Sequence, residues 1–222
     1  MVKIADIEIG EFPLILSPMD DITDLPFRSI CKPYGVDMLI TEFIAADGII
    51  READKSRKKM TFVETERPIA VQIFGHDLDS LLQSLEFVEA VNPDFIDINW
   101  GCPVKKVAGR GAGSGILKDI PKMIAITEAL VKASKLPITV KTRIGYEETN
   151  KPIVEVAERL QDIGVKAISI HGRTKTQMYK GEADWTLIGK VKENPRMTIP
   201  VFGNGDVTSA EIALDMKNRY GE

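Results

Sequence analysis

Short apolar runs recur along this chain at nearly regular intervals, and this repeat restricts the fold more than any other feature. The runs begin near residues 12, 38, 69, 95, 138, 167 and 200. Their side chains are apolar at successive positions, as in parallel strands that are covered on both faces. Amphipathic patterns lie between the runs, and in 78–88 the apolar residues share one helical face: Leu78, Leu81, Leu82, Leu85 and Val88. Alternating strands and helices predict an α/β protein with a parallel sheet.

Capping residues mark where several of these helices begin and end. Asp24 precedes a helical pattern over 25–34, and Asp77 precedes the pattern that begins at residue 78. An aspartate in this place accepts a hydrogen bond from a backbone N–H of the first turn. Gly164 follows a pattern over 152–163 and is expected to end that helix.

The number of strand–helix units favours one fold within the α/β class. The chain has seven such units and no glycine-rich dinucleotide fingerprint after the first strand, which favours a (β/α)8 TIM barrel over an open doubly wound sheet. An eighth strand is missing, and an open edge would expose unpaired backbone groups. We therefore expect a single domain over 1–222 that is a TIM barrel truncated before its eighth strand.

Charge is balanced overall and concentrated locally. The net charge of -4 does not indicate a general nucleic-acid binder. Positive residues gather at 55–59, which is expected to be a solvated face, and at Lys105, Lys106 and Arg110.

Cysteine usage and hydropathy exclude several classes of protein. Cys31 and Cys102 are too few for a disulfide framework, and neither has a close spacing to His76 or His171 that suits a metal. The chain has no signal-peptide pattern, and no apolar run approaches the ~20 residues of a membrane span. We expect no metal, no membrane association and a reducing cytoplasm.

Polar residues stand at the ends of most predicted strands, where the active sites of TIM barrels form. Gln72 can donate and accept hydrogen bonds, Lys141 can stabilise an anion, and His171 adds a donor. The turn Gly203-Asn204-Gly205-Asp206 precedes a helical pattern and suits a phosphate group, although Asp206 could cap that helix instead. Together these residues predict a planar, polar, partly anionic ligand.

A thiol stands at the end of the fourth predicted strand. Cys102 lies between Gly101 and Pro103, and such a turn can hold a side chain in one direction. The alternative is a small buried apolar residue, which is the usual state of an unpaired cysteine. The glycine-rich segment 109–115 lacks the spacing of a nucleotide loop and is expected to be a flexible lid or substrate loop.

Several motifs, in their order along nearly the whole chain, resemble those of the tRNA-dihydrouridine synthases. They are Ser17-Pro18-Met19 with Ile22-Thr23-Asp24 and Pro26-Phe27-Arg28, Val71-Gln72-Ile73-Phe74-Gly75, Asn99-Trp100-Gly101-Cys102-Pro103 with Lys106, Val140-Lys141-Thr142-Arg143, His171-Gly172-Arg173-Thr174 and Gly203-Asn204-Gly205-Asp206.

The resemblance implies a flavin-binding TIM barrel that reduces uridine in tRNA to 5,6-dihydrouridine, with NADPH reducing the FMN. It implies that Cys102 is the catalytic proton donor, that Asn99 lies beside the substrate base and that Arg173 lies on the substrate side. Lys105 and Lys106 are expected to meet tRNA phosphates. The residues expected to hold FMN are Ser17, Pro18, Met19, Gln72, Lys141, His171, Asn204, Gly205 and Asp206.

The chain also departs from the family pattern. Asp20 and Asp21 replace small residues, and their carboxylates are expected to point away from a flavin phosphate. Trp100 replaces a smaller residue. The last barrel strand and the C-terminal helical domain that grips tRNA are expected to be absent from these 222 residues.

Three other functions fit part of the pattern. A dihydroorotate dehydrogenase-like FMN barrel would act on a free pyrimidine, with the thiol as a base. A lyase without flavin would use Lys141 as a Schiff-base amine. A non-catalytic RNA-binding barrel would be colourless and would not oxidise NADPH.

Overall fold

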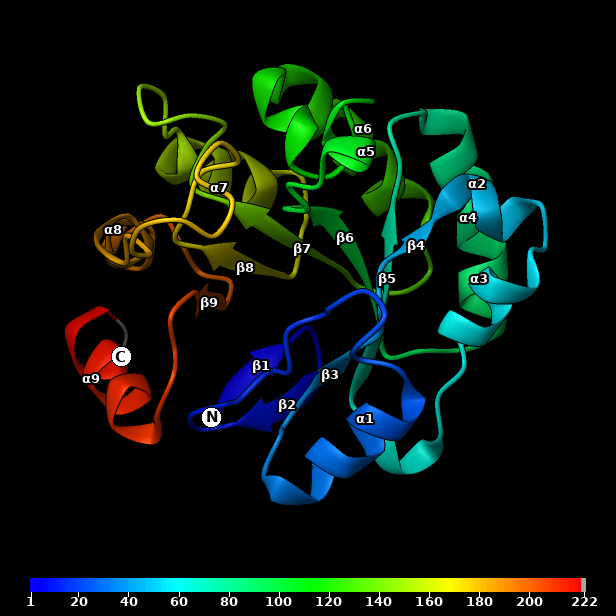
Figure 1. Cartoon of the computed structure of the whole chain (residues 1–222), viewed down its shortest axis with the longest axis horizontal. Helices are drawn as coiled ribbons and strands as arrows, with labels where there is room; N and C mark the ends of the chain where they lie inside the picture. Colours follow the sequence, from blue (N-terminus) through cyan, green and yellow to red (C-terminus); the bar gives the residue numbers. More distant parts are fainter. Residues whose placement is uncertain (221–222) are drawn as a thin grey trace. The chain divides into compact units, whose positions relative to one another are not determined.

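Strands and helices alternate along the chain in the computed structural model, which describes residues 1–220 (Figure 1). The strands are β1 (Val2–Ile4), β2 (Ile7–Gly10), β3 (Leu39–Ile40), β4 (Ile44–Ala45), β5 (Ile69–Phe74), β6 (Phe95–Trp100), β7 (Ile138–Arg143), β8 (Ala167–His171) and β9 (Val201–Asn204). The α-helices are α1 (Leu25–Cys31), α2 (Ala46–Ile50), α3 (Asp54–Lys59), α4 (Leu78–Ala90), α5 (Lys105–Ala108), α6 (Ile120–Ala133), α7 (Ile153–Asp162), α8 (Thr186–Glu193) and α9 (Ala210–Tyr220). Three 3-10 helices are η1 (Lys32–Tyr34), η2 (Glu64–Glu66) and η3 (Gly113–Lys118).

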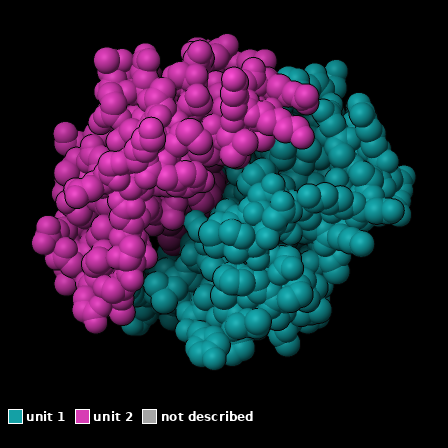
Figure 2. Space-filling model, in the orientation of Figure 1, with its two compact units in different colours: residues 1–99, 129–139 teal, residues 100–128, 140–222 magenta. Residues whose placement is uncertain are grey.

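The chain divides into two compact units (Figure 2). The N-terminal unit comprises residues 1–99 and 129–139, and the C-terminal unit comprises residues 100–128 and 140–222. Each unit is described by itself below.

In the N-terminal unit, β3, β5 and β6 are parallel neighbours in this order, and β4 also pairs with β5. Helices α2, α3 and α4 pack beside β4 and β5 (Figure 1). The core is made of side chains from these elements that are almost fully buried: Leu39, Ile69, Val71, Ile73, Leu81, Leu85, Val88, Phe95, Ile96 and Ile98. Burying each such aliphatic side chain stabilises the fold by roughly 1.5–3 kcal/mol.

In the C-terminal unit, β8 and β9 are parallel, and their register places His171 opposite Asn204. Helix α8 packs against α7, α9 and β9. The amphipathic helix α7 buries Ile153, Val156, Ala157 and Leu160.

The α/β class predicted from the repeat is confirmed. Parallel neighbours within each unit follow the order of the chain, as the successive strand–helix units of a TIM barrel do. Across residues 1–220, none of the helices combines the length and the apolar character needed to cross a membrane.

The predicted helix limits are confirmed at three positions. Asp24 caps α1 by accepting from the backbone N–H of Phe27, and Asp77 caps α4 by accepting from that of Ser80. Gly164 follows α7 with a φ of 100°, a conformation that glycine adopts without steric cost.

The first predicted strand is wrong in extent. The run over 12–16 forms only a bridge between Ile15 and Met38, and Leu14 donates its N–H to the side chain of Asp37 instead of to a strand. The N-terminal hairpin of β1 and β2 was not predicted. Its alternation of apolar and charged residues, Val2-Lys3-Ile4 and Ile7-Glu8-Ile9, was a usable signal.

Candidate active site

Two predicted site residues of the N-terminal unit are in direct contact. The register of β5 and β6 places Gln72 opposite Asp97. The side-chain Nδ2 of Asn99 donates to Oε1 of Gln72 at 2.8 Å, and Nε2 of Gln72 donates to Oδ2 of Asp97 at 2.6 Å. All three side chains are buried. They form a continuous chain of polar groups within an otherwise apolar pair of strands.

The predicted cofactor loop Ser17-Pro18-Met19 is held at its end by Thr23. The backbone N–H of Met19 donates to Oγ1 of Thr23 at 2.9 Å, and this hydroxyl donates back to the carbonyl of Met19. The carbonyl of Thr23 accepts from Nη1 of Arg28, whose Nε pairs with Glu66 at 2.8 Å. Both ion-paired side chains are 1% exposed. Removing one partner of such a buried pair would leave the other charge unpaired and would cost about 3–5 kcal/mol.

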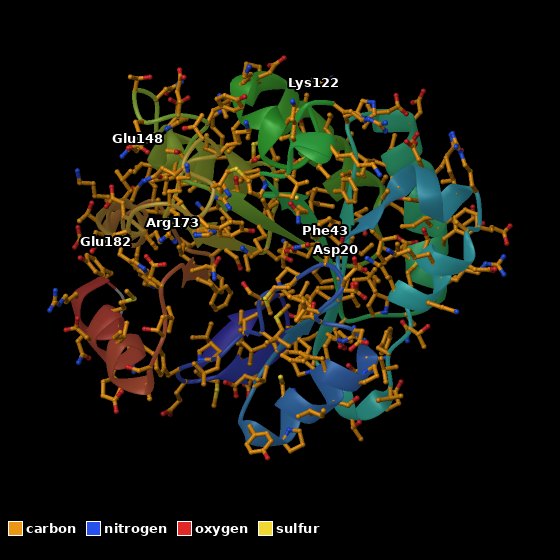
Figure 3. All side chains as sticks on the ribbon, in the orientation of Figure 1. Asp20, Phe43, Lys122, Glu148, Arg173 and Glu182 are labelled. Atoms are coloured by element: carbon orange, nitrogen blue, oxygen red, sulfur yellow. The ribbon has the colours of Figure 1, made fainter. Side chains whose placement is uncertain are left out.

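Asp20 and Asp21, which were expected to point away from a flavin phosphate, contact cationic side chains of α3. The carboxylate of Asp20, labelled in Figure 3, pairs with the ammonium group of Lys59. Asp21 lies 3.3 Å from Nζ of Lys55, and its backbone N–H donates to Oε1 of Glu42. The three carboxylates are close enough to hold a metal ion, but the ammonium group of Lys59 already supplies positive charge there.

The expectation that 55–59 is wholly a solvated face is wrong at Lys59. Its side chain is 11% exposed and lies 3.0 Å from the buried carboxylate of Glu42. Burial favours the neutral amine, but the hydrogen bonds to Asp20 and Glu42 outweigh it and hold the pKa of Lys59 above its usual value. The side chain therefore remains a cation that ties α3 to the loop at residue 20.

In the C-terminal unit, the turn that carries the predicted catalytic thiol is fixed on both sides. Nε of Arg143, at the end of β7, donates to the carbonyl of Gly101 at 2.8 Å. The carbonyl of Cys102 accepts from the backbone N–H of Ser114 at 3.0 Å and from its hydroxyl at 2.8 Å. Cys102 is 7% exposed.

The expectation of a flexible lid over 109–115 is wrong for its second half. Residues 112–117 are buried, and most of them belong to η3. A Cβ atom at Gly115 would lie 2.1 Å from the carbonyl oxygen of Ala108, so only glycine fits there. This segment acts as a support for the Cys102 turn, because Ser114 lies within it.

A buried cation accompanies the thiol. Arg143 is 2% exposed and donates to the carbonyls of Thr174 and Met178. Burial lowers the pKa of Arg143, while Tyr179 and Cys102 act in the opposite direction. A guanidinium group that interacts with a thiol stabilises the thiolate, which forms when the thiol gives up its proton.

Lys141 and His171 stand at neighbouring polar positions of the same unit. Nζ of Lys141 donates to Oδ1 of Asn204 at 3.0 Å. Burial, together with the charges of Arg143, Lys141 and Arg173, lowers the pKa of His171 to about 3. Nε2 of His171 lies 3.4 Å from Nη1 of Arg173, and a guanidinium can only donate. His171 is therefore neutral, with its proton on Nδ1.

Arg173 forms a two-point hydrogen-bonded ion pair with Asp206 through its two Nη atoms. Nη1 and Nη2 of Arg173, labelled in Figure 3, lie 2.8 and 2.9 Å from the two carboxylate oxygens. Oδ2 of Asp206 also accepts from the backbone N–H of Ala183 at 2.7 Å. The hydrogen bond from Arg173 is the main reason that the pKa of Asp206 is lowered. The prediction that Arg173 contacts substrate stays a prediction.

Residues 207–209 separate the turn at 203–206 from the helix that follows it. Helix α9 begins at Ala210, and the hydroxyl of Ser209 accepts from the N–H of Ile212 at its first turn. Asp206 therefore does not cap the helix. Gly205 has a φ of 115°, and a Cβ atom there would lie 2.7 Å from that of Ala183. Only glycine fits at position 205. A phosphate bound at this turn would be held by the backbone of the turn and not by the N-terminus of the helix.

Among the other residues singled out from the sequence, two lysines lie at the surface and a tryptophan is buried. Lys105 and Lys106 are exposed on α5. Trp100, an expected departure from the family pattern, is fully buried and donates from Nε1 to the hydroxyl of Thr127 at 3.0 Å. Its size is accommodated in the core.

Comparison with known proteins assigns this arrangement to a family. The model of the family described as "Dihydrouridine synthase (Dus)" matches residues 15–222. The chain belongs to the dihydrouridine synthase family.

Curated relatives agree with this assignment. The chain is 37% identical over 222 residues to a "Probable tRNA-dihydrouridine synthase" of Rickettsia conorii, which covers all of this chain and 66% of that protein. It is 38% identical over 208 residues to "tRNA-dihydrouridine synthase B" of Pseudomonas aeruginosa, covering 94% of this chain and 62% of that protein. It is 40% identical over 200 residues to "tRNA-dihydrouridine synthase B" of Vibrio parahaemolyticus, covering 90% and 62%. The chain thus spans about two thirds of the length of these relatives.

A solved structure supports the fold alone. The nitroalkane oxidase of Streptomyces ansochromogenes superposes with a TM-score of 0.53 at 14% identity, covering 96% of this chain and 64% of that one.

Several residues that support the site of this dihydrouridine synthase family member were missed from sequence. Asp97 carried a signal, because a carboxylate between the fully buried Ile96 and Ile98 must have hydrogen-bond partners. Lys59 and Ser114 carried none, since their roles depend on which distant segments fold beside them.

Proposed function

We propose that this chain is the catalytic part of an FMN-dependent enzyme that reduces uridine in tRNA to 5,6-dihydrouridine, with NADPH as the reductant. Family membership supports the reaction class. The observation that carries the assignment to this chain is the Cys102 turn, which Arg143 and Ser114 fix from two directions. Two thiols, at Cys31 and Cys102, suit the reducing cytoplasm, where we place the reaction.

Each unit, taken by itself, has donor groups of the kind that suit a planar anionic cofactor such as FMN. The N-terminal unit offers the buried amide of Gln72 and the loop at Ser17-Pro18-Met19. The C-terminal unit offers the ammonium group of Lys141 and the neutral ring of His171, whose Nδ1–H is a donor. A cation stabilises an anionic flavin, and neutral donors can bind its oxygen and nitrogen atoms. The turn that contains Asn204, Gly205 and Asp206 would contribute backbone groups.

The reduction needs a hydride at C6 and a proton at C5 of the uracil ring. A bound, reduced FMN supplies the hydride. Cys102 gives its proton to C5 and becomes a thiolate, which the charge of Arg143 stabilises and solvent reprotonates. General acid help of this kind is worth roughly 10²–10⁴ in rate. Asn99 holds the base, and Arg173, which is paired with Asp206, lies on the substrate side.

The target base has to leave the tRNA stack to reach a buried thiol, so we propose that the nucleotide is flipped out. Lys105 and Lys106 are exposed, and their positive charges would attract the phosphates of such a strand.

The decisive experiment supplies the purified enzyme with FMN, NADPH and an unmodified tRNA transcript, and follows NADPH oxidation together with the nucleoside composition of the tRNA. Dihydrouridine should form in the tRNA, and each converted uridine should gain the mass of two hydrogen atoms. Free uracil and orotate should not be reduced. NADPH oxidation without dihydrouridine would overturn the proposal.

Cys102→Ala tests the acid. This variant should bind FMN as the parent does and lose roughly 10²- to 10⁴-fold in turnover. Cys102→Ser is the matched variant, and it should be almost as slow, because a serine hydroxyl is a much weaker acid than a thiol. A parent-like rate in Cys102→Ala would remove Cys102 from the mechanism.

A further inference from the structure

A carboxylate that the proposed chemistry does not use lies in the middle of β6. Asp97 is 1% exposed, and its neighbours Ile96 and Ile98 are fully buried. Burying a carboxylate is costly unless hydrogen bonds compensate for it, so the partners of Asp97 explain its presence. Oδ1 accepts from the hydroxyl of Thr139 at 2.5 Å, and Oδ2 accepts from Nε2 of Gln72 at 2.6 Å.

The chemistry of these partners fixes the direction of a chain of hydrogen bonds. A carboxylate only accepts, so Gln72 must turn its NH2 group toward Asp97. The carbonyl of Gln72 is then left to face Asn99, whose NH2 group must donate to it. The amide oxygen of Asn99 therefore points in another direction. The backbone of Gln72 is also anchored, because its N–H donates to the hydroxyl of Thr41 at 3.1 Å.

We propose that Asp97 is a positioning residue that sets the donor and acceptor ends of both Gln72 and Asn99. Gln72 and Asn99 are the residues expected to meet the flavin and the uracil base, so this inference rests on the proposed function. An amide without such a partner can exchange the places of its oxygen and nitrogen. In the exchanged orientation it would present the wrong group to the ligand. Asp97 removes that choice without touching either ligand.

Asp97→Asn tests the inference in the flavin-loaded enzyme. An asparagine can donate as well as accept, so it no longer forces one orientation on Gln72. Asp97→Asn should weaken FMN binding, measured by fluorescence titration, and lower kcat/KM for tRNA at saturating FMN, each by roughly 10- to 100-fold. Asp94→Asn is the matched control. Asp94 precedes the same strand and accepts from the N–H of Ile69, and its replacement should leave both quantities unchanged.

A double-mutant cycle distinguishes positioning from a general structural role. If Asp97 acts on the base through Asn99, the Asp97→Asn change should not lower kcat/KM further in an Asn99→Ala background, although FMN binding should still weaken. Additive losses in kcat/KM would overturn the inference.

A charge swap keeps the test valid if Asp97→Asn folds poorly. In the Gln72→Glu/Asp97→Asn enzyme, residue 72 only accepts, so residue 97 and Asn99 must both donate to it. The orientation of Asn99 is thereby restored, although residue 72 can no longer donate to the flavin. At saturating FMN, kcat/KM should therefore recover roughly tenfold relative to Gln72→Glu alone, in which residues 72 and 97 are both carboxylates. Failure of the swap to recover would contradict the inference. Failure of the unaltered enzyme to reduce tRNA would instead contradict the proposed function.

Discussion

His171 stays uncharged because it is buried, 9% exposed, beside three cations. A further positive charge would gain no hydration there, and Arg143, Lys141 and Arg173 would repel it. The tautomer follows from the same neighbours, since Nε2 faces a guanidinium group that can only donate. The ring therefore offers the site a donor, Nδ1–H, and its charge does not change over the physiological pH range.

The low pKa of His171 has a consequence for stability that we predict in the cofactor-free protein. The pKa is about 3 in the folded chain and about 6.5 when unfolded, so the unfolded state binds more protons between these values. Stability is therefore complete above pH ~6.5 and falls as the pH is lowered toward 3. His171→Gln removes this contribution. Between pH 7 and pH 5 the parent should lose about 2 kcal/mol more free energy of unfolding than His171→Gln.

Urea unfolding of both proteins at the two pH values measures this difference. The ring resonances of His171 should also stay constant between pH 7 and pH 5. Parallel losses of stability in the parent and in His171→Gln would show that this ring protonates in the folded protein.

Helix α3 has only six residues, but it holds the loop at residue 20 through an ion pair. Lys59, at its end, pairs with Asp20 beside the predicted cofactor loop and with the buried Glu42. Lys59→Met keeps the aliphatic part of the side chain and removes the charge. It leaves a buried carboxylate without its cation, which should cost about 1–3 kcal/mol of stability.

We predict that the Lys59→Met change also weakens FMN binding, because Asp20, next to Met19, loses its ion pair with α3. Lys58→Met is the matched control, since Lys58 is exposed on the same helix and should change neither quantity. Thermal unfolding and fluorescence titration of FMN measure the two effects. Unchanged FMN affinity in a destabilised Lys59→Met protein would mean that the loop does not depend on this contact.

The elements predicted correctly are those whose signal lies within a few neighbouring residues. The aspartate caps at Asp24 and Asp77 and the apolar runs of β5 and β8 need no knowledge of distant segments. The run over 12–16 looked equally apolar, but Pro13 lacks an N–H and the side chain of Asp37 takes that of Leu14.

The site was predictable in its residue types and not in its supports. Motifs identified Gln72, Asn99 and Cys102, to which we assign roles in the proposed reaction. The residues that orient them act across the sequence: Ser114 lies 12 positions from Cys102, and Asp97 lies 25 from Gln72. Such pairings depend on strand register and loop packing, which cannot be read from a single sequence.

The proposed binding of tRNA has to overcome a net charge of -4 on the protein. An acidic protein binds a polyanion only where positive charge is gathered locally, and counterion release then makes the affinity depend on salt. Lys105 and Lys106 are exposed on α5, three and four residues after the predicted catalytic thiol. They are the cations through which we expect the C-terminal unit to meet tRNA phosphates.

The double variant Lys105→Ala/Lys106→Ala should therefore bind tRNA more weakly and with a shallower salt dependence. Losing two phosphate contacts should reduce the slope of log affinity against log salt by roughly 1.5, while FMN binding stays unchanged. Lys190→Ala/Lys192→Ala is the matched control, since it removes two exposed lysines from α8 of the same unit and alters the net charge equally. If both doubles reduce the slope to the same extent, the effect belongs to overall charge. If only the α5 double does, its two lysines contact the nucleic acid directly, and an unchanged slope there would exclude them from the tRNA-binding surface.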